Sequence, residues 1–328
     1  MHVFQDAYNA SDLPRGGVGT IGNFDGVHRG QQAILEQLTA RARSLSVPAM
    51  PAMVVTFDPH PLTVLAPERA PVPLTTPKQK EELLEKAGVS VMLVVRFTLE
   101  LSRVPARTFV REFLHDRLDL KEIFVGAGFT FGYQREGTLA LLQEMGREQG
   151  LTATAVDEVV YGGERISSTR IRRAIAEGNV TEAAEMLGRP YGLAGSIARG
   201  DRMGQKLGWP TINLMSDNKL LPADGVYACR VHFPSYPATF DCVTNIGTRP
   251  TVYENYQRVV ESHILDFKAN VYGQKIKLDF YKRLREERIF PTVMDLSAQI
   301  RRDVDATRDY FFRRRLEQEA PFAALEGE

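Results

Sequence analysis

Short apolar runs alternate with longer helix-like segments over the first half of the chain. The apolar runs predict five β-strands, Val18–Gly22, Met53–Phe57, Val91–Arg96, Glu122–Val125 and Leu151–Val156. The segments between them predict four helices, Gln31–Ser46, Pro77–Ala87, Pro105–Arg117 and Thr138–Gly150. Because the links are short, this alternation is typical of an α/β domain whose parallel sheet is covered by helices. Such a sheet binds ligands at the carboxyl ends of its strands.

The second half of the chain is rich in predicted strands. Two short helices, Ser168–Glu177 and Val180–Leu187, lead into the link Gly188–Pro190. Beyond this link, turns rich in Gly, Pro, Asn and Asp separate the predicted strands Gly225–Phe233, Thr239–Ile246, Gln257–Phe267 and Gln274–Tyr281. The pattern predicts a small antiparallel barrel or sandwich, and apolar residues at helical spacing over 293–315 predict a C-terminal helix packed on it. We therefore expect two domains, residues 1–188 and 189–328.

Charge and cysteine usage narrow the class of protein. Lys and Arg number 41, as do Asp and Glu, so the formal net charge is zero. Without a basic field, a dedicated nucleic-acid binder is disfavoured. The first residues have neither the charge nor the apolar core of a signal peptide, and no window reaches a membrane-spanning length. Cys229 and Cys242 lie in strand-like runs and favour buried thiols, which suits a reducing cytoplasm.

The segment from Gly17 to Gln31 joins a short strand, a glycine-rich turn and the start of a helix. Backbone N–H groups and the helix dipole favour anions at such a place, and glycine lets the chain approach a ligand closely. The imidazole of His28 at the helix start suggests chemistry on a phosphate. A tight Asn/Asp-Gly turn that carries a surface histidine is the alternative interpretation.

Two further motifs strengthen the phosphate interpretation. The run 167–170 opens a helix with three hydroxyl side chains and the cation Arg170. The dipole disfavours a cation there unless an anion is bound, although an N-cap serine followed by a first-turn arginine is also a common helix start. Asp58 and His60 directly follow a predicted strand, either as part of a site or as part of a proline-stiffened loop.

The strand-rich half carries polar residues at strand spacing. Thr211 and Asn213 share one face of a strand, where a hydroxyl and an amide oxygen suit Mg²⁺. Glu261 and His263 share a face in the same way, and Glu261 is a candidate general base. Polar side chains that face water on an antiparallel strand are the alternative interpretation. Three glycines would let backbone amides approach a phosphate chain, namely Gly195, Gly200 and Gly204.

Together the motifs resemble the bacterial bifunctional riboflavin kinase/FAD synthetases over nearly the whole chain. The segments 23–30, 56–61 and 166–170 look like their adenylyltransferase half, a Rossmann-like nucleotidyltransferase domain with a His-x-Gly-His motif. The resemblance implies that FMN attacks the α-phosphorus of ATP with release of pyrophosphate, and that His28 and Arg170 are catalytic. It implies flavin contacts at Asp58, His60 and Gly128. The implied ATP and phosphate contacts are Gly22, Asn23, Phe24, Asp25, Gly26, Gly30, Gln31, Ser167, Ser168 and Thr169.

The first half departs from the family pattern at two positions. The second histidine of the motif is Gln31, and the family's usual Asp or Asn is Gly128. Gln31 still donates a hydrogen bond but carries no charge, and the loss of one preorganised donor typically lowers a rate by on the order of 10²–10³. We therefore expect a slow adenylyltransferase that the substitution Gln31→His would accelerate.

The second half resembles riboflavin kinase in the Pro-Thr-x-Asn run at 210–213 and in the segments 222–228, 245–251 and 261–267. The likeness implies that Thr211 and Asn213 hold Mg²⁺. It also implies that Glu261 takes the proton from the ribityl 5′-hydroxyl as that oxygen attacks the γ-phosphorus of ATP. The flavin would be covered with the help of Arg283 and Arg285, and the glycines Gly195, Gly200 and Gly204 would lie along the phosphates.

We therefore expect an enzyme of flavin cofactor biosynthesis with ATP as co-substrate and riboflavin and FMN as substrates, without a nucleic-acid or membrane partner. One alternative is a riboflavin kinase whose first domain is degenerate at Gln31 and Gly128. Another is a flavin-binding sensor or carrier without turnover, which has no need of a base such as Glu261. A nucleotidyltransferase with a different acceptor would leave the second domain unexplained.

Overall fold

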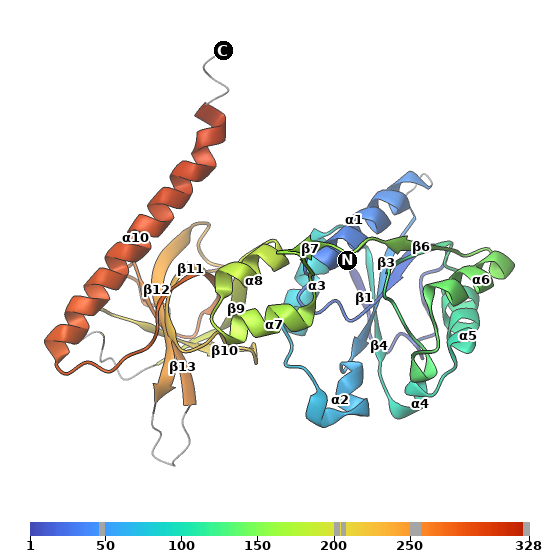
Figure 1. Ribbon diagram of the computed structural model, residues 1–328, viewed down its shortest axis with the longest axis horizontal. Helices are drawn as coiled ribbons and strands as arrows, with labels where there is room; N and C mark the ends of the chain where they lie inside the picture. The colour runs from blue at the N-terminus through green and yellow to red at the C-terminus, as the bar shows by residue number, and fades with distance from the viewer. Residues whose placement is uncertain (46–49, 200–203, 205–207, 250–256, 324–328) are drawn as a thin grey trace. The chain divides into compact units, whose positions relative to one another are not determined.

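The computed structural model describes residues 1–45, 50–199, 204, 208–249 and 257–323. The chain divides into two compact units, Met1–Thr169 and Arg170–Glu328 (Figure 1). Helix α8 (Val180–Leu187) and most of α7 (Ser168–Ala176) belong to the second unit, although the composition changes only at Gly188.

The first unit is built on a six-stranded sheet in the order β1-β4-β3-β2-β5-β6, and all neighbouring strands are parallel. The predicted parallel sheet is thus confirmed, with one further strand, β1, that is only three residues long. The strands are β1 (His2–Phe4), β2 (Val18–Ile21), β3 (Ala52–Asp58), β4 (Val91–Arg96), β5 (Glu122–Gly126) and β6 (Thr152–Val156).

Helices cover both faces of this sheet because its central strands are apolar on both sides. On one face, Val54 of β3 packs in a cluster with Leu35 of helix α1 (Arg29–Ser44) and Leu84 of α3 (Pro77–Lys86). On the other face, its neighbours Met53 and Val55 pack with residues of the remaining helices. These helices are α6 (Leu139–Gln149) and the π-helix η2 (Phe109–Arg117), which continues the short α5 (Ala106–Thr108).

Short elements fill the connections of the first unit. They are α2 (Pro61–Leu65), the 3₁₀ turns η1 (Pro67–Arg69) and η3 (Tyr133–Arg135), α4 (Leu99–Ser102), and the hairpin strands β7 (Val160–Tyr161) and β8 (Glu164–Arg165). Several of them follow the carboxyl ends of strands, where a parallel sheet places its ligands.

The second unit is a closed antiparallel barrel in the order β10-β13-β12-β11-β14-β9. This confirms the barrel that the turn-rich composition predicts. Its strands are β9 (Tyr191–Ala198), β10 (Ile212–Ser216), β11 (Gly225–His232), β12 (Thr239–Arg249), β13 (Gln257–Ile264) and β14 (Lys275–Arg285). Strand β9 illustrates the inside-outside alternation, since its buried residues fall at every second position.

The long helix α10 (Val293–Ala323) runs along the barrel, as predicted, and continues beyond the expected end at residue 315 (Figure 1). Ile300 and Val304 pack with Val226 and Val243 of the barrel. Further along the helix, the fully buried ring of Phe311 lies 4.5 Å below the guanidinium of Arg230. None of the helices that the structure describes has the length and apolar character needed to cross a lipid bilayer.

Candidate active sites

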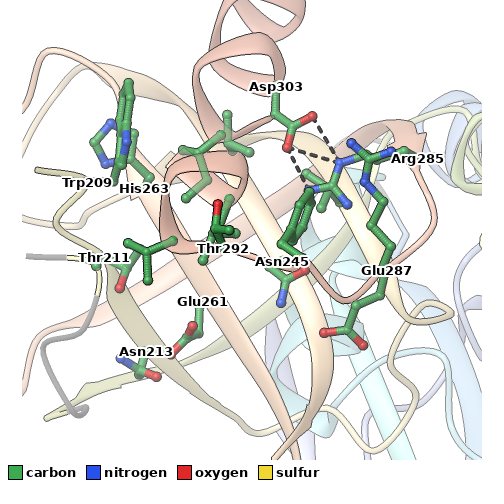
Figure 2. Close-up of a pocket in the computed structure, with 18 of the residues that line it drawn as sticks. Trp209, Thr211, Asn213, Asn245, Glu261, His263, Arg285, Glu287, Thr292 and Asp303 are labelled. Atoms are coloured by element: carbon green, nitrogen blue, oxygen red, sulfur yellow. Dashed lines mark hydrogen bonds and ion pairs between the residues drawn. The ribbon is translucent and has the colours of Figure 1, made fainter. Parts of the chain in front are cut away.

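Three polar residues lie in register across neighbouring strands of the barrel. Asn213 of β10 and Asn245 of β12 both pair with Glu261 of β13, so the carboxylate sits between two amides. All three side chains line one cavity of about 520 Å³. In Figure 2, Asn213, Glu261 and Thr211 gather at one side of this cavity. The sequence predicted Thr211, Asn213 and Glu261 as site residues, and the closed barrel brings all three together.

The rest of the cavity is largely apolar. Trp209 lies at one wall, where its indole Nε1 donates a hydrogen bond to Ser297 Oγ of α10 at 3.1 Å. Such a surface is suited to a flat aromatic ligand whose polar end reaches the carboxylate of Glu261. The apolar lining residues are Trp209, Val226, Val243, Phe290, Pro291, Val293, Leu296 and Ile300.

An ion pair closes the opposite side of the cavity. Arg285 at the end of β14 donates to both carboxylate oxygens of Asp303 on α10, at 2.8–3.1 Å, and the Asp303 side chain is only 6% exposed. The pair is drawn with dashed lines in Figure 2. Because charged groups this buried need a partner, the pair fixes the helix against the barrel beside the cavity. Arg283 does not line the cavity and instead donates to the carbonyl oxygen of Asp224 at 2.7 Å.

A second cavity of about 360 Å³ lies beside β10 and β13. Thr211 lines both cavities, whereas the neighbouring residues of β10 and of β13 alternate between the two linings. The second cavity is lined by Pro210, Thr211, Ile212, Ser262, Ile264, Phe267, Ala269, Asn270, Val271 and Tyr272.

The predicted phosphate-binding glycines of the barrel have different surroundings. Gly204 lines the larger cavity. Gly195 is a buried residue of β9 that lines neither cavity, and a Cβ there would come within 2.0 Å of the Met215 carbonyl oxygen. The close approach of two strands therefore explains this glycine. Gly200 lies outside the described residues.

In the first unit, His28 is the N-cap residue of α1 and forms a reciprocal pair with Gln31. His28 Nδ1 accepts from the Gln31 backbone N–H at 3.3 Å, and Gln31 Oε1 accepts from the His28 backbone N–H at 3.1 Å. Because Nδ1 acts as an acceptor, the ring proton sits on Nε2. The capping box therefore presents an N–H donor from the imidazole and occupies the carbonyl end of the Gln31 amide.

The two predicted phosphate motifs of the first unit lie side by side. Ser168 Oγ donates to the carbonyl oxygen of Asp25 at 2.9 Å, although the two residues are 143 positions apart. A Cβ at Gly30 would stand 3.3 Å from the His28 ring and 3.9 Å from the Ile166 carbonyl oxygen. The run that contains Ser167, Ser168 and Thr169 therefore begins next to the turn.

Other predicted residues around this turn contact other groups of the protein. The Asp25 carboxylate accepts from the backbone N–H groups of Leu74, at 2.9 and 3.1 Å, and Thr75, at 3.3 Å. The Asn23 amide lies 3.0 Å from Nε2 of His60. In the second unit, Arg170 forms an ion pair with Glu182 of α8 at 3.0 Å.

The remaining predicted positions of this half are placed as follows. A Cβ at Gly128 would stand 3.3 Å from the guanidinium of Arg165, which forms a 2.7 Å ion pair with Glu158. Asp58 and His60 line a cavity of about 160 Å³ together with Asn23. Beside Phe57, a further cavity of about 280 Å³ is lined mainly by apolar groups. Its lining residues are Phe57, Leu65, Phe97, Leu101, Ser102, Val104, Phe109, Phe131, Gly132, Tyr133, Gln134 and Arg135.

Each half of the chain matches a known protein family. Residues 10–170 match the family model described as FAD synthetase, and residues 187–311 match riboflavin kinase. A bifunctional riboflavin kinase/FMN adenylyltransferase of Escherichia coli (strain K12) is 38% identical over 95% of this chain and 98% of its own length. The chain belongs to this bifunctional family. A relative of the same name from Haemophilus influenzae is 34% identical over 95% of this chain and 99% of its own.

A solved structure also covers both units. The protein named "Macrolide-efflux Protein from Streptococcus pneumoniae" superposes with a TM-score of 0.83, at 27% sequence identity, over 93% of this chain and 98% of that one. The fold is therefore shared with a solved structure over nearly the full length of the chain, and the sequence relatives extend over 95% of it, as the sequence motifs predict.

Sequence reasoning gave no role to several residues that line the larger cavity of the barrel. Asn245 stands in a quoted family motif, but its place beside Glu261 depends on strand register. Asp303 had a readable signal, because it is a carboxylate on the apolar stripe of the predicted helix, next to Val304 and near Ile300. A charged residue on the buried face of a helix implies a partner, which is Arg285.

Proposed function

We propose that the barrel phosphorylates riboflavin with ATP and that the first unit transfers the adenylyl group of a second ATP to FMN, giving FAD. The observation that carries the proposal is the carboxylate of Glu261 between two amides at the polar end of an apolar cavity. We assign the catalytic halves to residues 1–188 and 189–328. The substrates and the two buried free thiols are consistent with a cytoplasmic location.

In the kinase reaction, Glu261 accepts the proton of the ribityl 5′-hydroxyl as its oxygen bonds to the γ-phosphorus. The bond from that phosphorus to the β–γ bridging oxygen breaks, and ADP leaves. A positioned carboxylate base typically contributes about 10²–10⁴-fold to the rate. We place the isoalloxazine in the larger cavity against Trp209, and the adenine in the smaller one, so that the two substrates meet at Thr211.

The donors at this meeting point suit Mg²⁺. Thr211 and Asn213 offer a hydroxyl and an amide oxygen, which are neutral hard ligands, and both line the cavity beside Glu261. Magnesium prefers oxygen ligands and normally keeps phosphates and water in its remaining positions. Bound there, the ion would supply neutralisation of the triphosphate charge, while Glu261 handles the proton.

In the adenylyl transfer, a phosphate oxygen of FMN bonds to the α-phosphorus of ATP as pyrophosphate leaves. The nucleophile is already an anion, so no general base is needed, and the protein supplies position and charge stabilisation. We assign this charge stabilisation to the Nε2–H of His28 and the N-terminus of α1, with Ser168 beside the turn. The aromatic cavity beside Phe57 offers a place for the isoalloxazine of FMN, next to Asp58 in the chain.

One assay tests the proposal. The purified protein is incubated with riboflavin, ATP and Mg²⁺, and flavins are separated by chromatography at intervals. We expect FMN first and FAD later. FMN that accumulates without FAD would support a kinase whose first unit only binds nucleotides or flavin. Riboflavin that is bound but never consumed would support the flavin sensor and overturn the proposal.

A further inference from the structure

The turn that opens helix α1 has an unusual backbone. Phe24, Gly26 and Val27 all have positive φ angles, of 46°, 87° and 42°. Left-handed geometry suits glycine, but it is uncommon for other residues and a clear outlier for a β-branched one such as Val27. A turn of this shape persists only when its surroundings hold it.

Side chains from three other places hold the carbonyl groups of this turn. Ser168 donates to Asp25 O at 2.9 Å, and Gln32 Nε2 donates to Val27 O at 2.8 Å. The third carbonyl, Asn23 O, accepts from Lys80 Nζ at 2.8 Å. In a planar trans peptide the carbonyl and the following N–H point in opposite directions, so each contact also fixes the direction of the next N–H.

Lys80 stands in an unfavourable place for a cation. It lies in the first turn of α3, where the helix dipole disfavours positive charge, and its side chain is half-buried. Burial lowers its pKa, and the carboxylates of Asp25 and Asp58 only partly oppose this effect. Its ammonium also lies 3.5 Å from Thr56 Oγ1, which itself donates to Asn23 O at 3.2 Å. Two donors thus converge on one carbonyl at the carboxyl end of β2.

We propose that Lys80 is a positioning residue of the adenylyl-transfer site, which fixes the Asn23 carbonyl and thereby aims the following N–H, that of Phe24, at the phosphates of ATP. Successive N–H groups in a turn of mixed handedness form a concave site for anions, and the direction of each group decides how well it stabilises developing charge. Lys80 acts through the backbone and does not touch ATP. The inference rests on the proposed adenylyl transfer to FMN.

The test compares Lys80→Met, which removes the donor but keeps an unbranched stem, with Lys80→Arg, which keeps a cationic donor. Lys78→Met is the matched control, because Lys78 lies in the same helical turn with its side chain 70% exposed. We expect Lys80→Met to lower kcat for FAD formation from FMN by ~10–100-fold. KM for FMN should change less than threefold, Lys80→Arg should recover most of the rate, and Lys78→Met should match wild type.

Riboflavin phosphorylation, measured in the same samples, reports whether each variant is folded. If Lys80→Met forms FAD at the wild-type kcat, the inference is wrong, and adenylyl transfer itself stands. If wild type forms no FAD, the proposed function of the first unit fails first. Should Lys80→Met be too unstable to assay, Lys80→Gln keeps a polar side chain but is too short to make the same contact with Asn23 O, and an unchanged kcat in that variant would equally overturn the inference.

Discussion

Nδ1 of His263 lies 2.8 Å from the carbonyl oxygen of Pro210. A carbonyl can only accept, so the ring donates from Nδ1. The ladder between β10 and β13 begins only at Ile212, and Pro210 has no N–H of its own to donate. The His263 side chain therefore holds the backbone immediately before Thr211, the residue that we assign to the metal.

This contact predicts that His263 sets the position of Thr211. His263→Phe keeps a ring against Trp209, now 5.4 Å away edge-to-face, but loses the donor. We expect the Mg²⁺ concentration for half-maximal kinase rate to rise about three- to tenfold. His263→Asn places an amide donor near the Nδ1 position and should return part of the shift. An identical Mg²⁺ midpoint in all three proteins would contradict this role.

Glu261→Gln should lower kcat for FMN formation by about 10²–10⁴-fold, because the amide cannot accept the 5′-hydroxyl proton. Binding of riboflavin, followed by flavin fluorescence, should survive, and conversion of added FMN to FAD should be unchanged. Glu287→Gln is the matched control, since this carboxylate lines the same cavity, and its loss of rate should stay below tenfold. Normal turnover in Glu261→Gln would remove that residue from the mechanism.

Thr211→Ala deletes one proposed metal ligand and should lower the kinase rate at low Mg²⁺, with partial rescue as Mg²⁺ is raised. Thr211→Ser, which keeps the hydroxyl, should titrate like wild type. A rate loss in Thr211→Ala that no concentration of Mg²⁺ reverses would argue against the ligand assignment.

Gln31 offers a sharper test of the adenylyl site. Gln31→Glu keeps the acceptor that caps the His28 backbone N–H but places negative charge near the phosphates, so FAD formation should fall while stability holds. Gln31→His should raise the rate of FAD formation by ~10-fold or more, at a loss of roughly 0.5–2 kcal/mol from the broken capping box. Equal rates of FAD formation in the three proteins would show that the side chain does not act on the phosphates.

Because the thiols of Cys229 and Cys242 are buried, we predict that the protein loses stability against unfolding at alkaline pH. The two residues face each other across β11 and β12 and are fully buried, and burial raises the pKa of both thiols. Above about pH 8.5 the unfolded chain releases these protons but the folded chain keeps them. The free energy of unfolding should then fall with rising pH, by at most ~1.4 kcal/mol per pH unit for each thiol.

The check is urea unfolding between pH 8 and 10 for wild type and for Cys229→Ala. The variant creates a cavity and will be less stable at every pH, but its stability should fall less steeply as the pH rises. Parallel slopes would mean that the Cys229 thiol does not contribute to the pH dependence.

Much of the fold was predictable because the chain repeats simple patterns. The apolar run Val91–Arg96 has the predicted bounds, and Val180–Leu187 does as well. The edge strand β1 was missed because its three residues carry no periodicity. The single helix predicted over 105–117 is a short α-helix followed by a π-helix, because the two form one continuous apolar stripe in the sequence.

The sites were predictable where the chemistry is local and less so where it depends on tertiary register. Thr211 and Asn213 could be predicted from their spacing of two residues, although β10 itself begins only at Ile212. Asn245 could not, because only the pairing of β12 with β13 sets it beside Glu261. Likewise, the sequence marks Asp25 as part of a turn, but only the folded chain shows that its carboxylate holds Leu74 and Thr75.

The lining of two cavities by Thr211 has a kinetic consequence. If riboflavin and ATP occupy these cavities as we propose, both can be bound together, and neither has to leave before the other enters. The phosphoryl group then passes directly from ATP to riboflavin within a ternary complex, without a phosphorylated enzyme intermediate. Double-reciprocal plots of initial rate against the two substrates should therefore intersect rather than run parallel.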